Sequence, residues 1–579
     1  MATALKKRVY LEIAEWLARD RGIAATLEGT IERETLKAIL IGGVWIPRSA
    51  IQRMEVLEVV RIDAGPQLRL RDDQLLWFCP FERNYMARDI PSGRWDAGAR
   101  AWRYPVSPAV AAEIIEAAGL TEADVQPEVW RLAEQYWTAH EMRQLDPARL
   151  PAFASRTEPW RHQKTGFWFT YHLPAVGLFM DMGSGKTKVV VDVIVNRNHR
   201  RVLVVCPKSA LYDVWERQVP AHSAAPVHLV VLDAPSTAKK VAQAKQAIAD
   251  AGDRPVVLVT NYESVWRNPL GDWLLEAGLD LVVLDESHRI KSPGSKVSLY
   301  CQRLGRTVPY RLCLTGTPAH NSPLDIYAQY RFLDPGIFGT SFQRFKERYA
   351  VLGGYTGKEV ISFKNLDDLQ RRMYMIAYRV RTEDVIDLPP EIDEERRFDL
   401  SKDAGELYER LFEEFVVDVK GGVVTADNAL TRLLRLQQIT SGFLPAQDPD
   451  DPSAPATTVR VDTGKEELLE DVLTDIPPHE PVVVFYRFDH DARVIEAVCR
   501  RIGRPFYEVS GKRKQILEWK QEQVGEGRPA GVVAVQVRAG EAGIDLSRAC
   551  YCIYYSLGFS LGDYHQSRRR VNRPGQTRS

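Results

Sequence analysis

The chain has 579 residues, enough for three or four domains of about 150 residues each. Hydrophobic residues make up 45% of it and charged residues 27%, while 77 Lys and Arg residues balance 77 Asp and Glu residues. This composition is typical of a globular protein with a large core, and it excludes a wholesale polycation but not a local basic groove. The charged N-terminus lacks the apolar region of a signal peptide, and no run of about 18 apolar residues occurs, so the sequence predicts an intracellular protein. The seven cysteines form no C-x-x-C pair, which argues against a zinc site.

Residues 1–120 differ in pattern from the rest of the chain. Within them, 68–120 alternates short apolar runs with turn residues and ends in a helical stretch. The sequence therefore predicts a small α+β module here, followed by a linker at 121–155.

From about residue 160, short apolar and β-branched runs alternate with longer helical stretches. Two series of buried strands are predicted, one at 201–207, 255–264, 280–288 and 310–318, and the other at 481–488, 504–511, 531–537 and 550–556. Near-continuous apolar strands of this kind belong to parallel sheets that helices cover on both faces. We therefore expect two α/β lobes, at 156–339 and 465–579, separated by a helical insertion at 340–444 and an exposed Pro-, Asp- and Ser-rich linker at 445–464.

The segment LFMDMGSGKTKVV (178–190) nearly matches a phosphate-binding loop. Gly183 and Gly185 allow backbone N–H groups to approach an anion, and a following helix would add its partial positive charge. Lys186 would reach the β- and γ-phosphates, and Thr187 would offer a hydroxyl to Mg²⁺. Met180 stands where the pattern has its first glycine, which leaves this mechanism intact. The alternative is a chance glycine-rich turn between a strand and a helix.

About a hundred residues later, LVVLDESH (281–288) reads as a buried strand that ends in two adjacent acids. At the carboxyl end of a strand beside the phosphate loop, Asp285 can hold Mg²⁺ and Glu286 can polarise the attacking water. An acidic strand-to-helix turn is the alternative for this segment alone. The two motifs in this order indicate a nucleotide site in the first lobe.

Further segments resemble the helicase motifs of the Swi/Snf-type branch of the superfamily-two ATPases. With DESH, they occur in the family's order between about 155 and 577, at 159–169, 202–219, 259–264, 314–339, 379–390, 433–442, 537–546 and 565–577. The resemblance implies two RecA-like lobes that close around Mg²⁺ and ATP. It implies nucleotide contacts by Gln163, which reads the base, and by Met182, Gly183, Ser184, Gly185, Lys186 and Thr187, with Thr187 and Asp285 as metal ligands.

The last of these motifs, HQSRRRVNRPGQT, carries the arginines that the family places at the nucleotide of the other lobe. The resemblance implies that Arg570 and Arg573 complete the site when the lobes close, a contribution of about 10³–10⁵ in rate in related chemistry. With Lys186, Asp285 and Glu286 they form the expected catalytic set. The neighbouring Arg568, Arg569 and Arg578 are better explained as a solvated basic tail.

A few letters depart from the family pattern. The chain has Met180-Asp181-Met182-Gly183 where the family has Asp-Glu-Met-Gly, Asp545 where it has Asn, and Asn572 where it has His. None of these changes removes a phosphate or metal ligand. The chain also stops at Ser579, directly after the sixth motif, where the family continues with a bracing helix; a naturally minimal protein and a truncated sequence are both compatible with this.

The resemblance also implies contacts to a double-stranded DNA backbone. VLVVCPKSALYDVWERQV (202–219) is similar to the motif that touches DNA, here through Lys208 and Ser209. VTNYES (259–264) supplies Asn261, and the fifth motif supplies Arg538. Such binding is largely to phosphates and is therefore nearly independent of base sequence.

In the N-terminal part, IPSGRWDAGARAWRYPV (90–106) is similar to the HARP module of annealing helicases. Trp95 and Trp102 lie close to Arg94 and Arg100 in a predicted turn, and exposed aromatics with arginines suit stacking on unpaired bases. The alternative is that both tryptophans fill a small β core.

The sequence thus predicts a monomeric, ATP-driven translocase on double-stranded or branched DNA that remodels forks or anneals strands in replication, recombination or repair. A protein-displacing or chromatin-type remodeller is the second hypothesis. Two further hypotheses are a DNA-binding scaffold with little turnover and an RNA helicase. The motif sequences DESH and TGTPAHN disfavour the RNA helicase. The compact motor and the Ala- and Arg-rich composition favour a bacterial or phage source.

Overall fold

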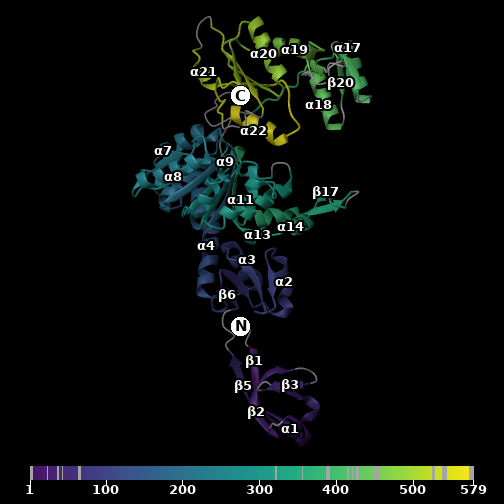
Figure 1. Ribbon diagram of the computed structural model, residues 1–579. Helices are drawn as coiled ribbons and strands as arrows, with labels where there is room; N and C mark the ends of the chain where they lie inside the picture. The colour runs from purple at the N-terminus through teal and green to yellow at the C-terminus, as the bar shows by residue number, and fades with distance from the viewer. Residues whose placement is uncertain are drawn as a thin grey trace. The chain divides into compact units, whose positions relative to one another are not determined.

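A computed structural model of the chain (Figure 1) divides into two compact units, Met1–Trp137 and Thr138–Ser579. The residues that the structure describes are 4–21, 24–34, 38–41, 44–62, 67–319, 322–354, 357–385, 391–413, 416–419, 422–425, 429–446, 457–523, 528–537 and 544–572. Among them, no helix is long and apolar enough to cross a membrane.

The first unit begins with a five-stranded antiparallel sheet in the order β4-β3-β2-β1-β5 (Figure 1). Its strands are β1 (Ala4–Ile13), β2 (Thr26–Glu34), β3 (Ala38–Ile41), β4 (Val44–Pro47) and β5 (Ile51–Ile62), with α1 (Glu15–Arg21) after the first and the short helix η1 (Arg48–Ala50) before the last. Leu11, Ile13, Leu17, Ile39 and Ile46 form its buried core.

A second antiparallel sheet follows in the same unit, in the order β6-β7-β9-β8. Its elements are β6 (Leu68–Arg71), β7 (Gln74–Trp77), η2 (Phe81–Arg83), α2 (Asn84–Asp89), β8 (Arg94–Asp96), β9 (Ala101–Pro105), α3 (Pro108–Ala118), η3 (Glu122–Asp124) and α4 (Pro127–Gln144). Ser107 caps α3 by accepting from Val110 N, and Gly119 ends it in the left-handed conformation.

This arrangement bears on two expectations about the N-terminal part. The small module expected at 1–120 lies within one compact unit, Met1–Trp137, and holds two sheets with separate cores. The stretch 121–155 is not simply a linker, because α4 lies within it and Val129 and Ala133 of this helix are buried in the second core. The apolar face of α4 packs against the second sheet, so this segment is part of the folded unit and not an extended linker.

The second unit contains a seven-stranded sheet in the order β12-β13-β11-β14-β15-β10-β18, in which every pair is parallel. The strands are β10 (Ala175–Met180), β11 (Arg201–Cys206), β12 (His228–Val231), β13 (Val256–Asn261), β14 (Leu281–Asp285), β15 (Tyr310–Leu314) and β18 (Ala377–Val380). Every residue of β10, β13 and β14 is buried, as expected for central strands of a sheet covered on both faces.

The helices of this lobe connect the parallel strands. They are α5 (Arg161–His172), α6 (Lys186–Asn196), the π-helical turn η4 (Leu211–Glu216), α7 (Arg217–His222), α8 (Thr237–Ala251), α9 (Tyr262–Val265), α10 (Leu270–Glu276), η5 (Ser287–Ile290), α11 (Lys296–Leu304), η6 (Pro323–Asp325), α12 (Ile326–Leu333), α13 (Pro335–Phe338) and α14 (Phe342–Tyr349). Several of these helices are labelled in Figure 1.

The region expected to be a helical insertion, 340–444, is mixed. Its first part contains the hairpin β16 (Ala350–Gly353) and β17 (Glu359–Phe363), then α15 (Leu366–Met373), β18 and α16 (Thr382–Val385). Because β18 pairs with β10, the first lobe extends beyond residue 339.

The second part of that region precedes the next lobe. It contains α17 (Lys402–Glu413), β19 (Val416–Val419), β20 (Gly422–Thr425), α18 (Ala429–Thr440), β21 (Phe443–Ala446) and β22 (Thr457–Arg460). The expected linker at 445–464 is corrected at its ends, because β21 and β22 pair with each other, whereas 447–456 lies outside the described residues.

The final lobe is a four-stranded parallel sheet in the order β24-β25-β23-β26. Its elements are α19 (Gly464–Asp475), β23 (Val482–Tyr486), α20 (Asp489–Arg501), β24 (Phe506–Val509), α21 (Ile516–Gln521), β25 (Val532–Gln536), β26 (Tyr551–Tyr554) and α22 (Leu561–Val571). The predicted fold class, two parallel-sheet lobes preceded by a small α+β N-terminal module, is confirmed, whereas the region between the lobes contains strands as well as helices.

Candidate functional site

The phosphate-loop segment joins the buried strand β10 to the helix α6. Gly183 and Gly185 have φ values of 81° and 84°, which favour glycine, and a Cβ on Gly185 would lie 2.2 Å from Gln163 Nε2. Ser184 is fully buried, and its hydroxyl donates to the Asp181 carbonyl oxygen at 2.6 Å. The loop therefore has the close backbone approach that an anion cradle at a helix N-terminus requires.

Lys186, the first residue of α6, folds back over this loop. Its Nζ donates to the carbonyl oxygens of Met180 at 2.9 Å and Asp181 at 3.2 Å. Met180, which replaces the first glycine of the usual pattern, is fully buried at the end of β10, so its side chain stays out of the loop. Thr187 follows Lys186 in the first turn of α6 and is partly exposed.

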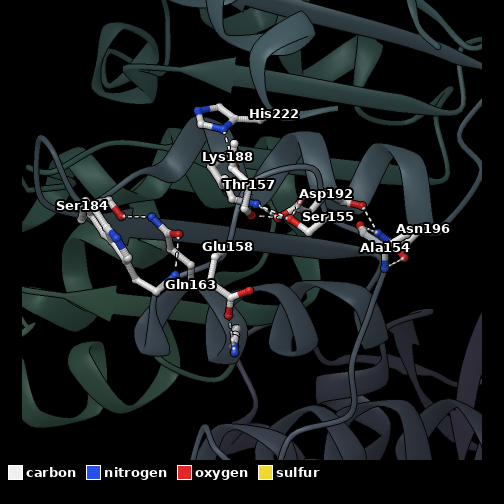
Figure 2. Close-up of polar contacts among 12 residues, drawn as sticks. Ala154, Ser155, Thr157, Glu158, Gln163, Ser184, Lys188, Asp192, Asn196 and His222 are labelled. Atoms are coloured by element: carbon white, nitrogen blue, oxygen red, sulfur yellow. Dashed lines mark hydrogen bonds and ion pairs between the residues drawn. The ribbon is translucent and has the colours of Figure 1, made fainter. Parts of the chain in front are cut away.

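Gln163 lies against the other side of the loop. Its Nε2 donates to the Ser184 carbonyl oxygen at 3.0 Å, and its Oε1 accepts from Trp160 N at 3.0 Å (Figure 2). The neighbouring His162 contacts the same Ser184 carbonyl oxygen through Nε2 at 2.8 Å. The residue expected to read the base is thus held directly beside the phosphate loop.

The acid pair lies at the end of β14: Asp285 is the last residue of the strand, as the sequence predicts, and Glu286 follows it. Asp285 is buried, its Oδ2 accepts from Trp215 Nε1 at 2.9 Å, and its Oδ1 accepts from the Glu286 backbone N–H at 3.0 Å. Burial raises the pKa of Asp285, and the charge of Glu286 adds to this, while the Trp215 hydrogen bond and the charge of Lys186 oppose it. Trp215, on η4, is a neighbour of the site that spacing along the sequence did not indicate.

Glu286 has a left-handed backbone with φ of 50°, which turns its side chain away from the strand direction. Its Oε2 lies 3.4 Å from both His288 Nδ1 and Thr315 Oγ1. Burial alone would raise the pKa of Glu286, but the His288 hydrogen bond and the charges of His288, Lys186 and Arg570 outweigh it and hold this pKa well below its usual range. The structure therefore places an ionised carboxylate within the field of Lys186 and Arg570.

The arginines of α22 have separate environments. Arg570 is fully buried, its Nη1 donates to the Ile544 carbonyl oxygen at 3.4 Å, and its charge acts on Glu286. Arg573 lies outside the described residues.

Arg568 and Arg569 correct the expectation of a solvated tail. Arg568 forms ion pairs with Glu391 and Asp393, and Arg569 forms an ion pair with Asp181 of the phosphate loop. Asp181 is buried, and its carboxylate also accepts from Thr382 N at 3.1 Å. This hydrogen bond and the Arg569 guanidinium together offset the cost of burying the carboxylate charge.

The site has few candidate metal ligands of its own. Among the described residues, no group of three or more His, Cys, Asp or Glu side chains could hold a metal ion. A single carboxylate with a hydroxyl nevertheless suits Mg²⁺, which keeps several waters and takes phosphate oxygens as ligands. Asp285 and Thr187 therefore fit a magnesium ion bound together with a nucleotide.

The expected DNA contacts are only partly available. Lys208 is exposed and Ser209 partly exposed just after β11, at the carboxyl end of a central strand. Asn261 is buried, and its side chain accepts from Ser264 N at 2.9 Å and caps α9; its contact with DNA stays a prediction. Arg538 lies outside the described residues.

The two tryptophans of the N-terminal unit differ. Trp102 is only 9% exposed, belongs to the core of the second sheet and donates from Nε1 to Asn84 Oδ1 at 2.9 Å. This corrects its expected role in stacking on bases, because its ring is covered. Trp95 is 50% exposed and contacts Trp102 edge to face with ring centroids 5.9 Å apart. Phe81 and Tyr85, which the sequence did not single out, are 85% and 66% exposed in the same part of the fold.

Two family models match the lobes of the second unit. One, described as SNF2-related domain, matches residues 162–442, and the other, described as Helicase conserved C-terminal domain, matches residues 464–575. Together the two matches span more than half of the chain.

Curated relatives match over the same region. The TATA-binding protein-associated factor MOT1 of Saccharomyces cerevisiae is 29% identical over 312 residues, which cover 48% of this chain and 16% of that protein. The CHD3-type chromatin-remodeling factor PICKLE of Arabidopsis thaliana is 24% identical over 430 residues, covering 69% of this chain and 30% of that protein. This chain thus spans less than a third of the length of either relative. A solved structure described as Sulfolobus solfataricus SWI2/SNF2 ATPase core in complex with dsDNA is 22% identical, covers 74% of this chain and 88% of its own, and has a TM-score of 0.38.

Proposed function

Because the chain belongs to the Snf2-type branch of the superfamily-two ATPases, we propose that it hydrolyses ATP with Mg²⁺ and uses the energy to translocate along double-stranded DNA. The observation that carries this proposal is the environment of Glu286. Its carboxylate lies in the field of Lys186, from the phosphate loop, and of Arg570, from the last helix. A carboxylate that feels the charges of a lysine on the phosphate loop and of an arginine on the other lobe suits a proton acceptor for phosphoryl transfer to water.

Each residue has one role in this mechanism. Lys186 exchanges its bonds with the Met180 and Asp181 carbonyl oxygens for bonds with phosphate oxygens. Asp285 and Thr187 would hold Mg²⁺, which would neutralise charge on the phosphates when bound. Glu286 orients the attacking water and accepts its proton, and Arg570 stabilises the charge of the transition state.

DNA contact is proposed for the first lobe at Lys208 and Ser209. These residues follow β11, which pairs directly with β14, the strand that ends in Asp285. A lysine and a hydroxyl suit backbone phosphates and carry no base information. Binding should therefore weaken steeply as salt increases.

Phosphate release by the full chain tests this function. We expect hydrolysis to be stimulated by duplex DNA more than by RNA, and Lys208→Ala to reduce the stimulation without changing hydrolysis in the absence of DNA. Duplex binding without hydrolysis would instead identify a scaffold, and greater stimulation by RNA would identify an RNA helicase.

We propose further that the chain acts on forked or unpaired DNA, as in fork remodelling or strand annealing. The support is the exposed aromatic set Phe81, Tyr85 and Trp95, together with the exposed Arg94 and Arg100. Each base stacked on an aromatic ring contributes about 1–3 kcal/mol, so one or two stacked bases would bias binding toward a fork by roughly ten- to hundred-fold. The likeness of residues 90–106 to the HARP module stays a prediction.

Surface variants separate this role from folding. Phe81→Ala and Tyr85→Ala remove exposed rings, so the fold should tolerate them, and together they should reduce the preference for forks over plain duplex. Phe412→Ala, another exposed aromatic but in the second unit, is the matched control. An unchanged preference for forks in the double variant would overturn the assignment.

A protein-displacing or chromatin-type remodeller is the second candidate, and the printed names of the relatives favour it. They include a TATA-binding protein-associated factor and a chromatin-remodeling factor. Release of a protein roadblock from plain duplex, at a rate that the Phe81→Ala and Tyr85→Ala changes do not affect, would favour this function over fork remodelling.

A further inference from the structure

Residues 154–160, here called the strap, cross the helix α6 without forming a helix or strand of their own. One end of the strap is tied to the end of α6: Ala154 N donates to Asn196 Oδ1 at 3.0 Å, and Asn196 Nδ2 donates to the Ala154 carbonyl oxygen at 2.8 Å (Figure 2). The strap then runs toward the start of α6, where the phosphate loop lies.

The middle of the strap rests on a buried ion pair of α6. Lys188 Nζ and Asp192 Oδ2 are 2.6 Å apart, with side chains only 5% and 2% exposed. Ser155 Oγ accepts from Lys188 Nζ at 2.5 Å and lies 3.0 Å from Asp192 Oδ1. Figure 2 shows the three side chains pointing toward one another from the helix and the strap.

Helix α7 holds the strap from a second side. Thr157 Oγ1 and His222 Nδ1 are 2.8 Å apart, and Arg156 Nη1 donates to the Pro220 carbonyl oxygen at 2.8 Å. The strap is thus attached to two helices before it reaches Trp160.

The last residue of the strap, Trp160, is also the N-cap of α5, and its backbone N–H helps to orient one amide. Trp160 N donates to Gln163 Oε1, while Gln163 Nε2 donates to the Ser184 carbonyl oxygen, so the amide cannot rotate by 180° without losing both bonds. Each amide atom keeps one further site, an acceptor on Oε1 and a donor on Nε2. This orientation matches the N6 donor and N7 acceptor of adenine and mismatches guanine, which presents two acceptors at the same edge.

Burying the Lys188–Asp192 ion pair carries a desolvation penalty, so the pair is a poor means of stabilising the fold. Burial raises the pKa of Asp192, and the hydrogen bond and charge of Lys188 oppose this only in part. Well-packed apolar residues often replace a buried ion pair at no cost to stability, and in some proteins a buried polar pair instead specifies one geometry. A role in positioning accounts for the cost.

We propose that Ser155, Lys188 and Asp192 are positioning residues that hold the strap, fix the Gln163 amide and thereby give the nucleotide site its selectivity for adenine over guanine. This inference rests on the proposed function of Gln163 as the reader of the base. It concerns how the reader is held, since neither the ion pair nor Ser155 contacts the phosphate loop in the bonds described above.

Direct binding of ATP and GTP to the full chain, in the presence of Mg²⁺, tests the proposal. Ser155→Ala removes the link between strap and ion pair while leaving the pair intact, and we expect the ratio of ATP to GTP affinity to fall by about five- to ten-fold, part of what one bidentate base contact contributes. At saturating ATP the turnover number should stay within about two-fold, because the bonds described above tie the strap to α6 and α7 and not to the acid pair. Ser155→Thr keeps the hydroxyl and should restore the ratio.

The exposed ion pair Lys164–Glu158 offers a matched control on the same strap. Its atoms are 2.9 Å apart and the Glu158 side chain is 84% exposed, so Glu158→Gln should leave the ratio within about two-fold. Lys188→Met and Asp192→Asn should each lower the ratio at least as much as Ser155→Ala.

Three outcomes are distinguishable. A selective wild-type protein whose Ser155→Ala variant keeps the same ratio would overturn the role of the strap. Equal loss of ATP and GTP affinity with a lower unfolding temperature would make the strap a merely structural support and would also overturn it. A wild-type protein that binds neither nucleotide would contradict the proposed function itself.

Discussion

Replacing the carboxylate of Glu286 by an amide is the most direct test of the proposed chemistry. Glu286→Gln keeps the size of the side chain and its contacts with Thr315 and His288, but it removes the charge that the structure holds ionised. A positioned general base contributes about 10²–10⁴ in rate, so we expect the turnover number for ATP to fall by about that factor. ATP affinity should be unchanged or tighter, because the positive charges of Lys186 and Arg570 then lack a competing carboxylate.

Single-turnover hydrolysis with duplex DNA measures this directly, with nucleotide affinity determined on the same sample. The lowered pKa of Glu286 adds a second check: the group stays ionised down to well below the ordinary glutamate pKa of 4.5, so the wild-type rate should not fall through protonation of Glu286 between pH 6 and pH 4. Asp285→Asn is the companion variant, and its defect should instead be a higher requirement for Mg²⁺. Turnover of Glu286→Gln within ten-fold of wild type would refute the assignment of the base.

Other substitutions separate the remaining roles. Lys186→Ala should abolish ATP hydrolysis and leave duplex binding within a few-fold; equal loss of both would contradict its assignment to the phosphates. Arg570→Ala should lower the turnover number by about 10³ or more with little change in ATP affinity, whereas Arg568→Ala, which removes ion pairs elsewhere on α22, should not act on turnover to that extent. Trp215→Phe removes the donor to the buried Asp285 carboxylate, a loss of about 1.5–3 kcal/mol for a charged hydrogen bond, and should raise the Mg²⁺ concentration needed for half-maximal rate roughly ten-fold or more. An unchanged Mg²⁺ requirement would mean that Asp285 is not a metal ligand.

The central strands of both lobes were predictable because their burial leaves a continuous apolar run in the sequence. This holds for β11, β13 and β14 of the first sheet and for β23 and β25 of the second, whereas the edge strands β24 and β26 were also predicted although they are only partly buried. The two edge strands of the first sheet, β12 and β18, were missed. Each has only four residues, and β12 is mostly half-buried, so neither carries the long apolar signal of a central strand.

In the N-terminal unit, the local sequence did not predict which aromatic side chains are exposed. Trp95 and Trp102 lie in similar local sequence, next to arginines and turn residues, yet one ring is half-exposed and the other is covered by the core. The two residues lie directly opposite each other on the paired strands β8 and β9, but β9 is inside the sheet and β8 is at its edge, and only the Trp102 ring belongs to the buried core. The exposed Phe81 and Tyr85 were missed for the same reason.

The sequence by itself determined the positions of the phosphate loop and of the acid pair, because these depend on local backbone needs: glycines where φ is positive, a lysine at the first turn of a helix, and acids at the end of a buried strand. Only the tertiary structure decided which distant groups meet them. The pairing of Arg569 with Asp181, the bond from Trp215 to Asp285 and the hold of Ser155 on Lys188 and Asp192 join residues whose separation in the sequence carries no period or spacing. Such contacts depend on how helices and strands pack. The sequence does not show whether a charged or hydroxyl side chain is surrounded by water or by a buried partner, because the residue type is the same in both cases.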